Sequence, residues 1–151
     1  MDLHELTAAP LSSEDDARTL LKAFEDNSLP RAAWNHRAHL SVALHFGRRL
    51  AADQALDRMR SEILRFNAAV GIESTPDSGY HETLTVFYMH LVSVHAARYP
   101  TPSSAATDAN AFVAEWGRRD LPLDYYSRSV LFSLTARARW VAPDIAPLPI
   151  A

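Results

Sequence analysis

The chain contains no cysteine, and this absence excludes several classes of site at once. Without thiols there is no disulfide framework, no zinc–thiolate or iron–sulfur centre and no cysteine nucleophile. Long apolar runs are also missing, because no stretch approaches the ~20 residues that a membrane-spanning helix needs. The N-terminal residues 1–5 lack the basic and apolar regions of a signal peptide, so we expect a cytoplasmic protein.

The chain also lacks a large excess of charge. Its 15 Lys and Arg against 18 Asp and Glu give a net charge of -3 with neutral histidine. We therefore expect no bulk attraction to nucleic acid or to an anionic membrane surface. Lys22 is the only lysine, and such arginine- and alanine-rich usage is typical of GC-rich bacterial genomes. Phosphate-binding glycine loops, the G-x-S-x-G elbow and the H-E-x-x-H zinc motif are all absent.

Glycine is scarce, with four in 151 residues, and β-branched runs are few, which argues against an all-β domain. The length suits a single domain with a core that needs no disulfide or structural metal. Repeated helical periodicity predicts an all-α, bundle-like domain of five or six helices over residues 1–151. We expect residues 1–11 to be a loose N-terminus and the proline-rich residues 141–151 to be an extended tail.

The helix boundaries are predicted from capping residues, turn formers and apolar spacing. The first helix starts after Ser12 or Ser13 and ends at residues 27–30, the second covers about residues 32–50, the third ends at Gly71, the fourth covers about residues 80–99, and the fifth starts after Ser103 or Ser104. Residues 121–126 are expected to be irregular, and one or two short helices are expected between residues 127 and 140.

Seven histidines are present, and the positions of three of them carry the main functional signal. On the predicted second helix, His36 and His39 lie one turn apart on the apolar side, about 5–6 Å apart at Cβ. His81 opens the mostly apolar fourth helix, directly after a turn-rich loop of the kind that often borders active sites. If the starts of these two helices meet, the three imidazoles would hold one divalent transition metal (Zn, Fe or Cu) with an open coordination position.

Other side chains are candidates for the surroundings of such a centre. Glu82 lies about 100° around the helix from His81 and would be a fourth ligand or an acid/base beside a metal-bound water. Tyr126 is a second catalytic candidate, through its hydroxyl group, although tyrosine rings also commonly cover the edge of a core. The predicted substrate pocket is lined by Trp34, Tyr80, Thr85, Tyr125 and Arg128.

Four short motifs contain most of these residues. They read W-x-H-x-x-H-L at residues 34–40, G-Y-H-E-T-x-T at residues 79–85, Y-Y-S at residues 125–127 and A-R-x-x-W-V-x-P-D-x-x-P-L-P in the segment that ends at Pro149. This pattern resembles a family of small uncharacterised bacterial proteins of similar length, over most of the chain from Trp34 onward. The resemblance implies no activity or substrate. It implies that His36, His39, His81 and Glu82 belong to one recurring site.

Three hypotheses of different classes follow from these residues. The leading one is a small metal-dependent enzyme that activates water or dioxygen, or polarises an oxygen of a small-molecule substrate. The second is a metal-free helical module that binds a small molecule or a partner through the same histidines and tyrosines. The third is a structural, dimerising bundle whose histidines form a satisfied polar network. The sequence leaves open whether the chain forms a homo-oligomer, and a haem with one axial histidine is an outside option.

Overall fold

The computed structural model describes residues 2–151 and consists of helices joined by short loops. That range contains no strand. Its elements are α1 (Glu14–Glu25), η1 (Arg31–Ala33), α2 (His36–Arg49), α3 (Ala52–Val70), α4 (Glu82–Arg98), α5 (Ala105–Trp116), η2 (Leu121–Asp124), α6 (Arg128–Leu131) and α7 (Leu134–Ala138). The all-α prediction is confirmed. Seven α-helices form rather than five or six, because both α6 and α7 are present in addition to the five longer helices.

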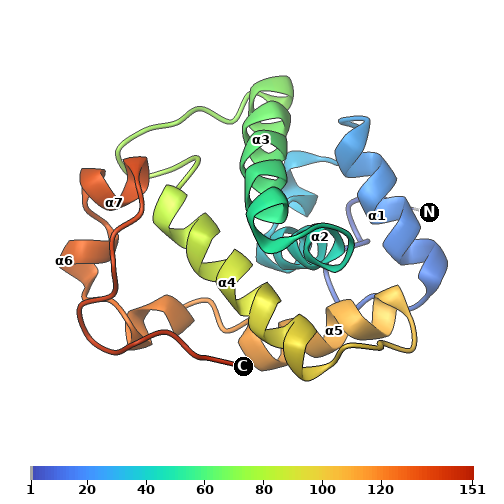
Figure 1. Ribbon diagram of the computed structural model, residues 1–151. Coiled ribbons are helices and arrows are strands. Elements are labelled where there is room, and N and C mark those ends of the chain that lie inside the picture. The colour runs from blue at the N-terminus through green and yellow to red at the C-terminus, as the bar shows by residue number, and fades with distance from the viewer. Residues whose placement is uncertain (1) are drawn as a thin grey trace.

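Helix α4 lies in the middle of the fold. It contacts α2 and α3 on one side and α7 on another, and α2 also packs against α3 and α5. Figure 1 shows α1, α2 and α3 on one side of α4, with α6 and α7 on the opposite side. This position explains why α4 is apolar in nearly every direction, since a helix with neighbours all round has no wide solvent-facing stripe.

Most of the α-helices begin at a side chain that accepts a hydrogen bond from a free backbone N–H group. These capping residues are Ser13, Asn35, His81, Ser104, Ser127 and Ser133. The cap at Asn35 corrects the predicted start of the second helix near residue 32. Its Oδ1 accepts from the backbone N–H of Ala38 at 3.0 Å, so α2 begins at His36 and a separate 3-10 turn precedes it.

The loop between α3 and α4 is fixed at both of its glycines. Gly71 ends α3 in the left-handed conformation (φ 77°), where the sequence places the helix stop. Gly79 has a φ of 86° and approaches the backbone of Glu73 so closely that an added Cβ would lie 2.7 Å from the carbonyl oxygen. Arg137 of α7 donates hydrogen bonds to the carbonyl groups of Pro76 and Gly79, so the C-terminal helices hold this loop in place.

Both ends of the described chain are tied to the helices. Residues 2–11 were expected to be loose, but Leu6 and Leu11 are buried and the Thr7 hydroxyl donates to the Ala33 carbonyl at 2.7 Å. The expectation for Met1 lies outside the described residues. Residues 141–151 contain no helix, and near their end the Pro149 carbonyl is 2.6 Å from the Nε2 atom of His90.

The core is rich in fully buried aromatic rings. Phe24, Trp34 and Phe66 form one cluster, with the rings of Phe24 and Trp34 stacked at 4.6 Å and those of Phe24 and Phe66 at 5.1 Å. This cluster joins α1, α3 and the segment before α2, and therefore fixes Trp34 beside the start of α2. Among the helices of residues 2–151, none is both long enough and apolar enough to cross a membrane.

Candidate functional site

A pocket of about 490 Å³ lies among α2, α3, α4 and the loop that precedes α4. We call it the α2–α4 pocket. Its apolar walls include Leu40, Ala43, Met59, Ile63, Leu84 and Met89. Its polar and aromatic walls include Trp34, His36, His39, His81, Tyr88 and Arg119. This size, together with a mostly apolar lining and a few polar groups, is typical of small-molecule sites in proteins.

All three histidines of the predicted metal centre line the α2–α4 pocket, but the ring nitrogens of His81 are occupied. Its Nδ1 accepts from the backbone N–H of Leu84 at 3.1 Å, which makes His81 the cap of α4. Its Nε2–H donates to the carbonyl of Leu131 at 2.8 Å. Burial is the main cause that lowers the pKa of His81, so the ring is neutral at pH 7 and both nitrogens serve the fold.

His39 presents a free lone pair to the pocket. Its Nδ1–H donates to the carbonyl of Asn35 at 2.8 Å, which fixes the tautomer and leaves Nε2 as the acceptor. The ring stacks on Trp34 with a centroid distance of 3.8 Å. Burial lowers the pKa of His39 to about 4, and the Asn35 carbonyl offsets this only in part. At pH 7 His39 is therefore a neutral imidazole held in one orientation.

His36 and Tyr88 form a second polar pair in the pocket. Their rings meet edge to face with centroids 5.3 Å apart. Within residues 2–151, the Nε2 atom of His36 and the hydroxyl of Tyr88 are buried and have no hydrogen-bond partner. Burial and the charge of Arg119 lower the pKa of His36, and burial raises the pKa of Tyr88. Both groups are therefore neutral at pH 7 and available for hydrogen bonding.

Buried polar atoms without a partner are concentrated at this pocket. The described residues contain five of them, on Trp34, His36, Tyr88, His95 and Trp116. The first three belong to residues that line the α2–α4 pocket, and the unpaired atom of Trp34 is its indole nitrogen. Buried polar groups in native proteins are nearly always paired, so three unpaired groups on one set of walls require an explanation.

Glu82, expected as a metal ligand or acid/base, is engaged elsewhere. Arg60 of α3 binds both of its carboxylate oxygens, at 2.9 and 2.7 Å, and the Tyr80 hydroxyl donates to Oε1 at 2.5 Å. The hydrogen bonds from Arg60 are the largest cause that lowers the pKa of Glu82, and they outweigh burial. Glu82 is therefore ionised at pH 7, and its place in the structure is an ion pair between α4 and α3.

The metal centre stays a prediction. Within residues 2–151, no group of three or more His, Cys, Asp or Glu side chains is arranged to hold a metal ion. The hydrogen bonds of His81 are a further obstacle, since it would have to release Leu131 or Leu84 before one of its nitrogens could become a ligand. His36 and His39 have no such obstacle at their Nε2 atoms.

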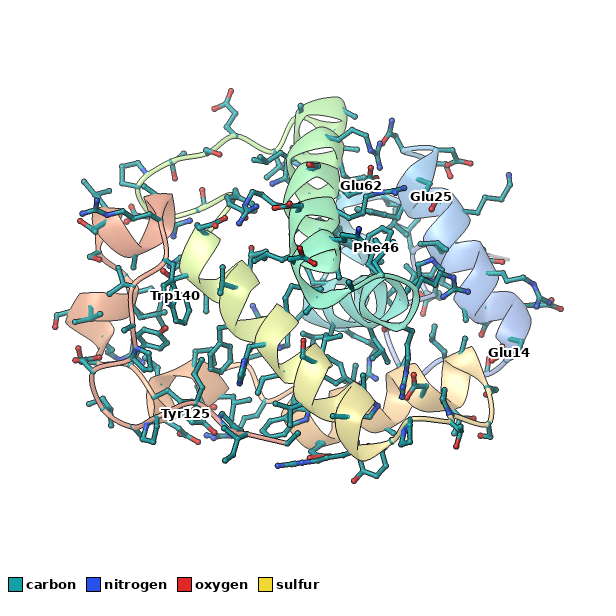
Figure 2. All side chains as sticks on the ribbon, in the orientation of Figure 1. Glu14, Glu25, Phe46, Glu62, Tyr125 and Trp140 are labelled. Atoms are coloured by element: carbon teal, nitrogen blue, oxygen red, sulfur yellow. The ribbon has the colours of Figure 1, made fainter. Side chains whose placement is uncertain are left out.

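The other predicted pocket residues fall into two groups. Trp34, Tyr80 and Thr85 line the α2–α4 pocket, whereas Tyr125, Tyr126 and Arg128 do not. Figure 2 shows Tyr125 and Trp140 beside the C-terminal helices, away from α3. Tyr126, expected as catalytic, is 1% exposed and donates its hydroxyl proton to the Val141 carbonyl at 2.7 Å, so here it fastens the C-terminal segment to the core.

Two pocket residues were not singled out from the sequence. Tyr88 lies seven residues after His81 on α4, and this spacing places both on one side of the helix, which was the available signal. Arg119 follows α5 in an irregular segment, and nothing in the local sequence indicates that it reaches the pocket.

Comparisons with known proteins add no relative to this picture. No protein-family model matches the chain, and no curated protein or solved structure matches it either. The functional assignment therefore depends on the pocket itself.

Proposed function

We propose that this protein binds a small organic molecule in the α2–α4 pocket. The observation that carries the proposal is the concentration of unpaired buried polar atoms: Trp34 Nε1, His36 Nε2 and the Tyr88 hydroxyl all belong to residues that line the same pocket. The rest of the lining is mostly apolar. Such a lining suits the apolar body of an organic molecule better than it suits inorganic ions.

Each unpaired group becomes more stable when a ligand enters and supplies its missing partner. A buried donor or acceptor without a partner costs about 1–3 kcal/mol relative to a satisfied one. A ligand that supplies the missing partners recovers this free energy and also buries its apolar surface against Leu40, Met59 and Ile63. The pocket is thus built to discriminate, because an analogue that lacks the matching polar groups leaves the same atoms unpaired.

The neutral histidines extend the proposal towards catalysis. His39 has one fixed lone pair facing the pocket, and its pKa of about 4 keeps that lone pair free of a proton at pH 7. A base of this kind accepts hydrogen bonds well but removes only acidic protons. We therefore assign His39 a role in binding. It would accept a proton only from a substrate that carries an acidic group.

The test uses the Tyr88→Phe variant, which removes one unpaired hydroxyl and keeps the ring. Ligands are first found by screening a library of small organic compounds for a rise in melting temperature. For those that bind wild-type protein, Tyr88→Phe should weaken binding by about tenfold. The variant should keep or slightly raise the stability of the free protein, since it removes a buried group that had no partner.

The matched control is Tyr126→Phe. The Tyr126 hydroxyl is bonded to Val141 and lies outside the pocket, so this variant should lose stability and keep its affinity for ligands. The proposal is refuted if no compound binds, or if Tyr88→Phe destabilises the free protein as much as Tyr126→Phe does and leaves every affinity unchanged.

A transition metal is the second candidate ligand, and the geometry of His39 favours it. An imidazole whose Nδ1–H is held by a backbone carbonyl presents Nε2 in the manner usual for metal ligands. His36, one turn earlier on α2, adds a second unpaired Nε2. Zn, Fe or Cu would then be held by these two histidines, with His81 as a third only after it leaves the Leu131 carbonyl.

Metal analysis separates the two candidates. Protein purified without an affinity tag should contain stoichiometric metal under the second candidate, and this metal should be lost in His39→Gln. Titration of the metal-free protein with Zn²⁺ should then raise the melting temperature of the wild type and not of the variant. If neither effect is seen while organic compounds still bind, the metal candidate is removed and the first proposal stands.

A further inference from the structure

The charge of the α2–α4 pocket is one-sided. Arg119 lines the pocket with His36 and Tyr88; burial and then its positive charge lower the pKa of His36, while for Tyr88 burial raises the pKa and the charge of Arg119 opposes this in part. No Asp or Glu side chain is among the residues that line the pocket in the described part of the chain. The histidines of the pocket are neutral at pH 7, so the net charge of the lining is that of the guanidinium alone.

The guanidinium of Arg119 is exposed and free for a ligand. In residues 2–151 it forms no ion pair, in contrast to Arg48 and Arg60, each of which binds a carboxylate with two nitrogens. An arginine that is held neither by a carboxylate nor by a carbonyl keeps its planar set of donors available for an anion.

Besides the charge of Arg119, the pocket holds a neutral hydrogen-bond donor that an anion can use. Within the described residues the Tyr88 hydroxyl is a donor without a partner, and Arg119 lines the same pocket, so two groups that can donate to an anion belong to one set of walls. The remaining walls are apolar, with Leu40, Met59 and Ile63 coming from α2 and α3. A ligand that satisfies both ends has a negatively charged head and an apolar body.

We infer that the ligand of the α2–α4 pocket is an organic acid, with its carboxylate bound by Arg119 and the Tyr88 hydroxyl and its apolar part against α2 and α3. The inference rests on the proposed function and names the ligand class for that same site. A carboxylate is favoured over a phosphate because one guanidinium matches one negative charge, and its planar donors fit the two oxygens of a carboxylate.

The experiment compares acids with their own amides. The probes are octanoate with octanamide and 3-phenylpropanoate with 3-phenylpropanamide, each titrated into wild-type protein and into Arg119→Gln by calorimetry. In wild-type protein each acid should bind at least about tenfold more tightly than its amide, since a hydrogen bond to a charged group is stronger than one to a neutral group. The preference should weaken with added salt, because the guanidinium is exposed.

The variant decides the origin of the preference. Arg119→Gln should remove the acid preference and weaken amide binding far less than acid binding, because an amide carries no charge that pairs with the guanidinium. The matched control is Arg128→Gln, which removes an arginine that lies outside the pocket and should keep the full preference.

The outcomes distinguish this inference from the function on which it rests. If amides bind as tightly as acids, or if the acid preference persists in Arg119→Gln, the acid inference is refuted, while weaker amide binding by Tyr88→Phe would keep the pocket as a binding site. If no probe of either kind binds at all, the acid inference falls, and the library screen with Tyr88→Phe then decides the proposed function by itself.

Discussion

Removal of one partner from the buried network of Arg48, Asp108 and His95 should be among the most destabilising single substitutions in this fold. The Asp108 carboxylate is 6% exposed and accepts three hydrogen bonds, from Arg48 Nε at 2.7 Å, Arg48 Nη2 at 2.9 Å and His95 Nε2 at 2.8 Å. The network joins α2, α4 and α5. Burial raises the pKa of Asp108, but the bonds from Arg48 and His95 outweigh burial and leave that pKa below its ordinary value.

The perturbation is Asp108→Ala, and its magnitude follows from what it leaves behind. The Arg48 side chain is 15% exposed and the His95 side chain 2% exposed, so water can replace only a small part of what the two side chains lose. Removing one partner of a buried ion pair typically costs about 3–5 kcal/mol. For a chain of this length the melting temperature should fall by about 6–20 °C. Asp108→Asn keeps one acceptor oxygen and should lose roughly half as much free energy.

The assay is thermal and urea unfolding followed by circular dichroism at pH 7, with Asp120→Asn as the control. Asp120 pairs with Arg118 at the surface, where both side chains are more than half exposed, and such a pair contributes less than about 1 kcal/mol. The double variant Arg48→Met with Asp108→Leu should lose less than the sum of the two single variants, since it leaves no unpaired charge. A loss for Asp108→Ala no larger than that for Asp120→Asn would refute the reasoning.

Three further predictions concern the loop before α4 and its first turn. Gly79→Ala should cost about 1–3 kcal/mol by thermal unfolding, because φ is 86° and the new Cβ meets the Glu73 carbonyl, whereas Gly71→Ala has open space and should lose only about 1 kcal/mol. His81→Ala should lose about 2–3 kcal/mol in urea unfolding and His81→Asn about half of that, since asparagine can still cap α4 but cannot reach Leu131; equal losses would contradict this division. Glu82→Gln should be less stable than wild type at pH 7. The difference should shrink as the pH falls below the unfolded pKa of about 4.3 and disappear once the pH has passed through the lower folded-state pKa, because the contribution of the carboxylate is lost on protonation.

The fold could be predicted from the sequence because helix signals are local. Ser13 and Ser104 were among the expected caps, and Gly71 ends α3 where its residue type indicates. The predicted start of α2 was too early, although the residue that sets the true start, Asn35, can be read in the sequence. Asn35 is a strong capping residue, but Ala32 and Ala33 are equally compatible with a helix, and only the bond from Ala38 to the Asn35 side chain selects the later start.

The candidate site could be predicted only in part, because helical periodicity gives the direction of a side chain and not the bonds that its atoms make. His36, His39 and His81 were predicted to converge, and all three line one pocket. The use of the His81 ring depends on Leu131, fifty residues away, and the use of Glu82 depends on Arg60, on another helix. Neither partner is visible in a local pattern, so residue types typical of a metal site serve instead as a helix cap and an ion pair.

The unpaired polar groups of the pocket, and not the H-E-T segment at residues 81–83, indicate where a ligand binds. Every polar group in that segment has a partner in the described structure: His81 has Leu131 and Leu84, and Glu82 has Arg60. About 10 Å further along α4, two turns after His81, the Tyr88 hydroxyl has none. A helix that satisfies its polar groups on its first turn and leaves one open two turns later departs from the rule that local and tertiary preferences agree, and such departures are expected where a ligand completes the structure.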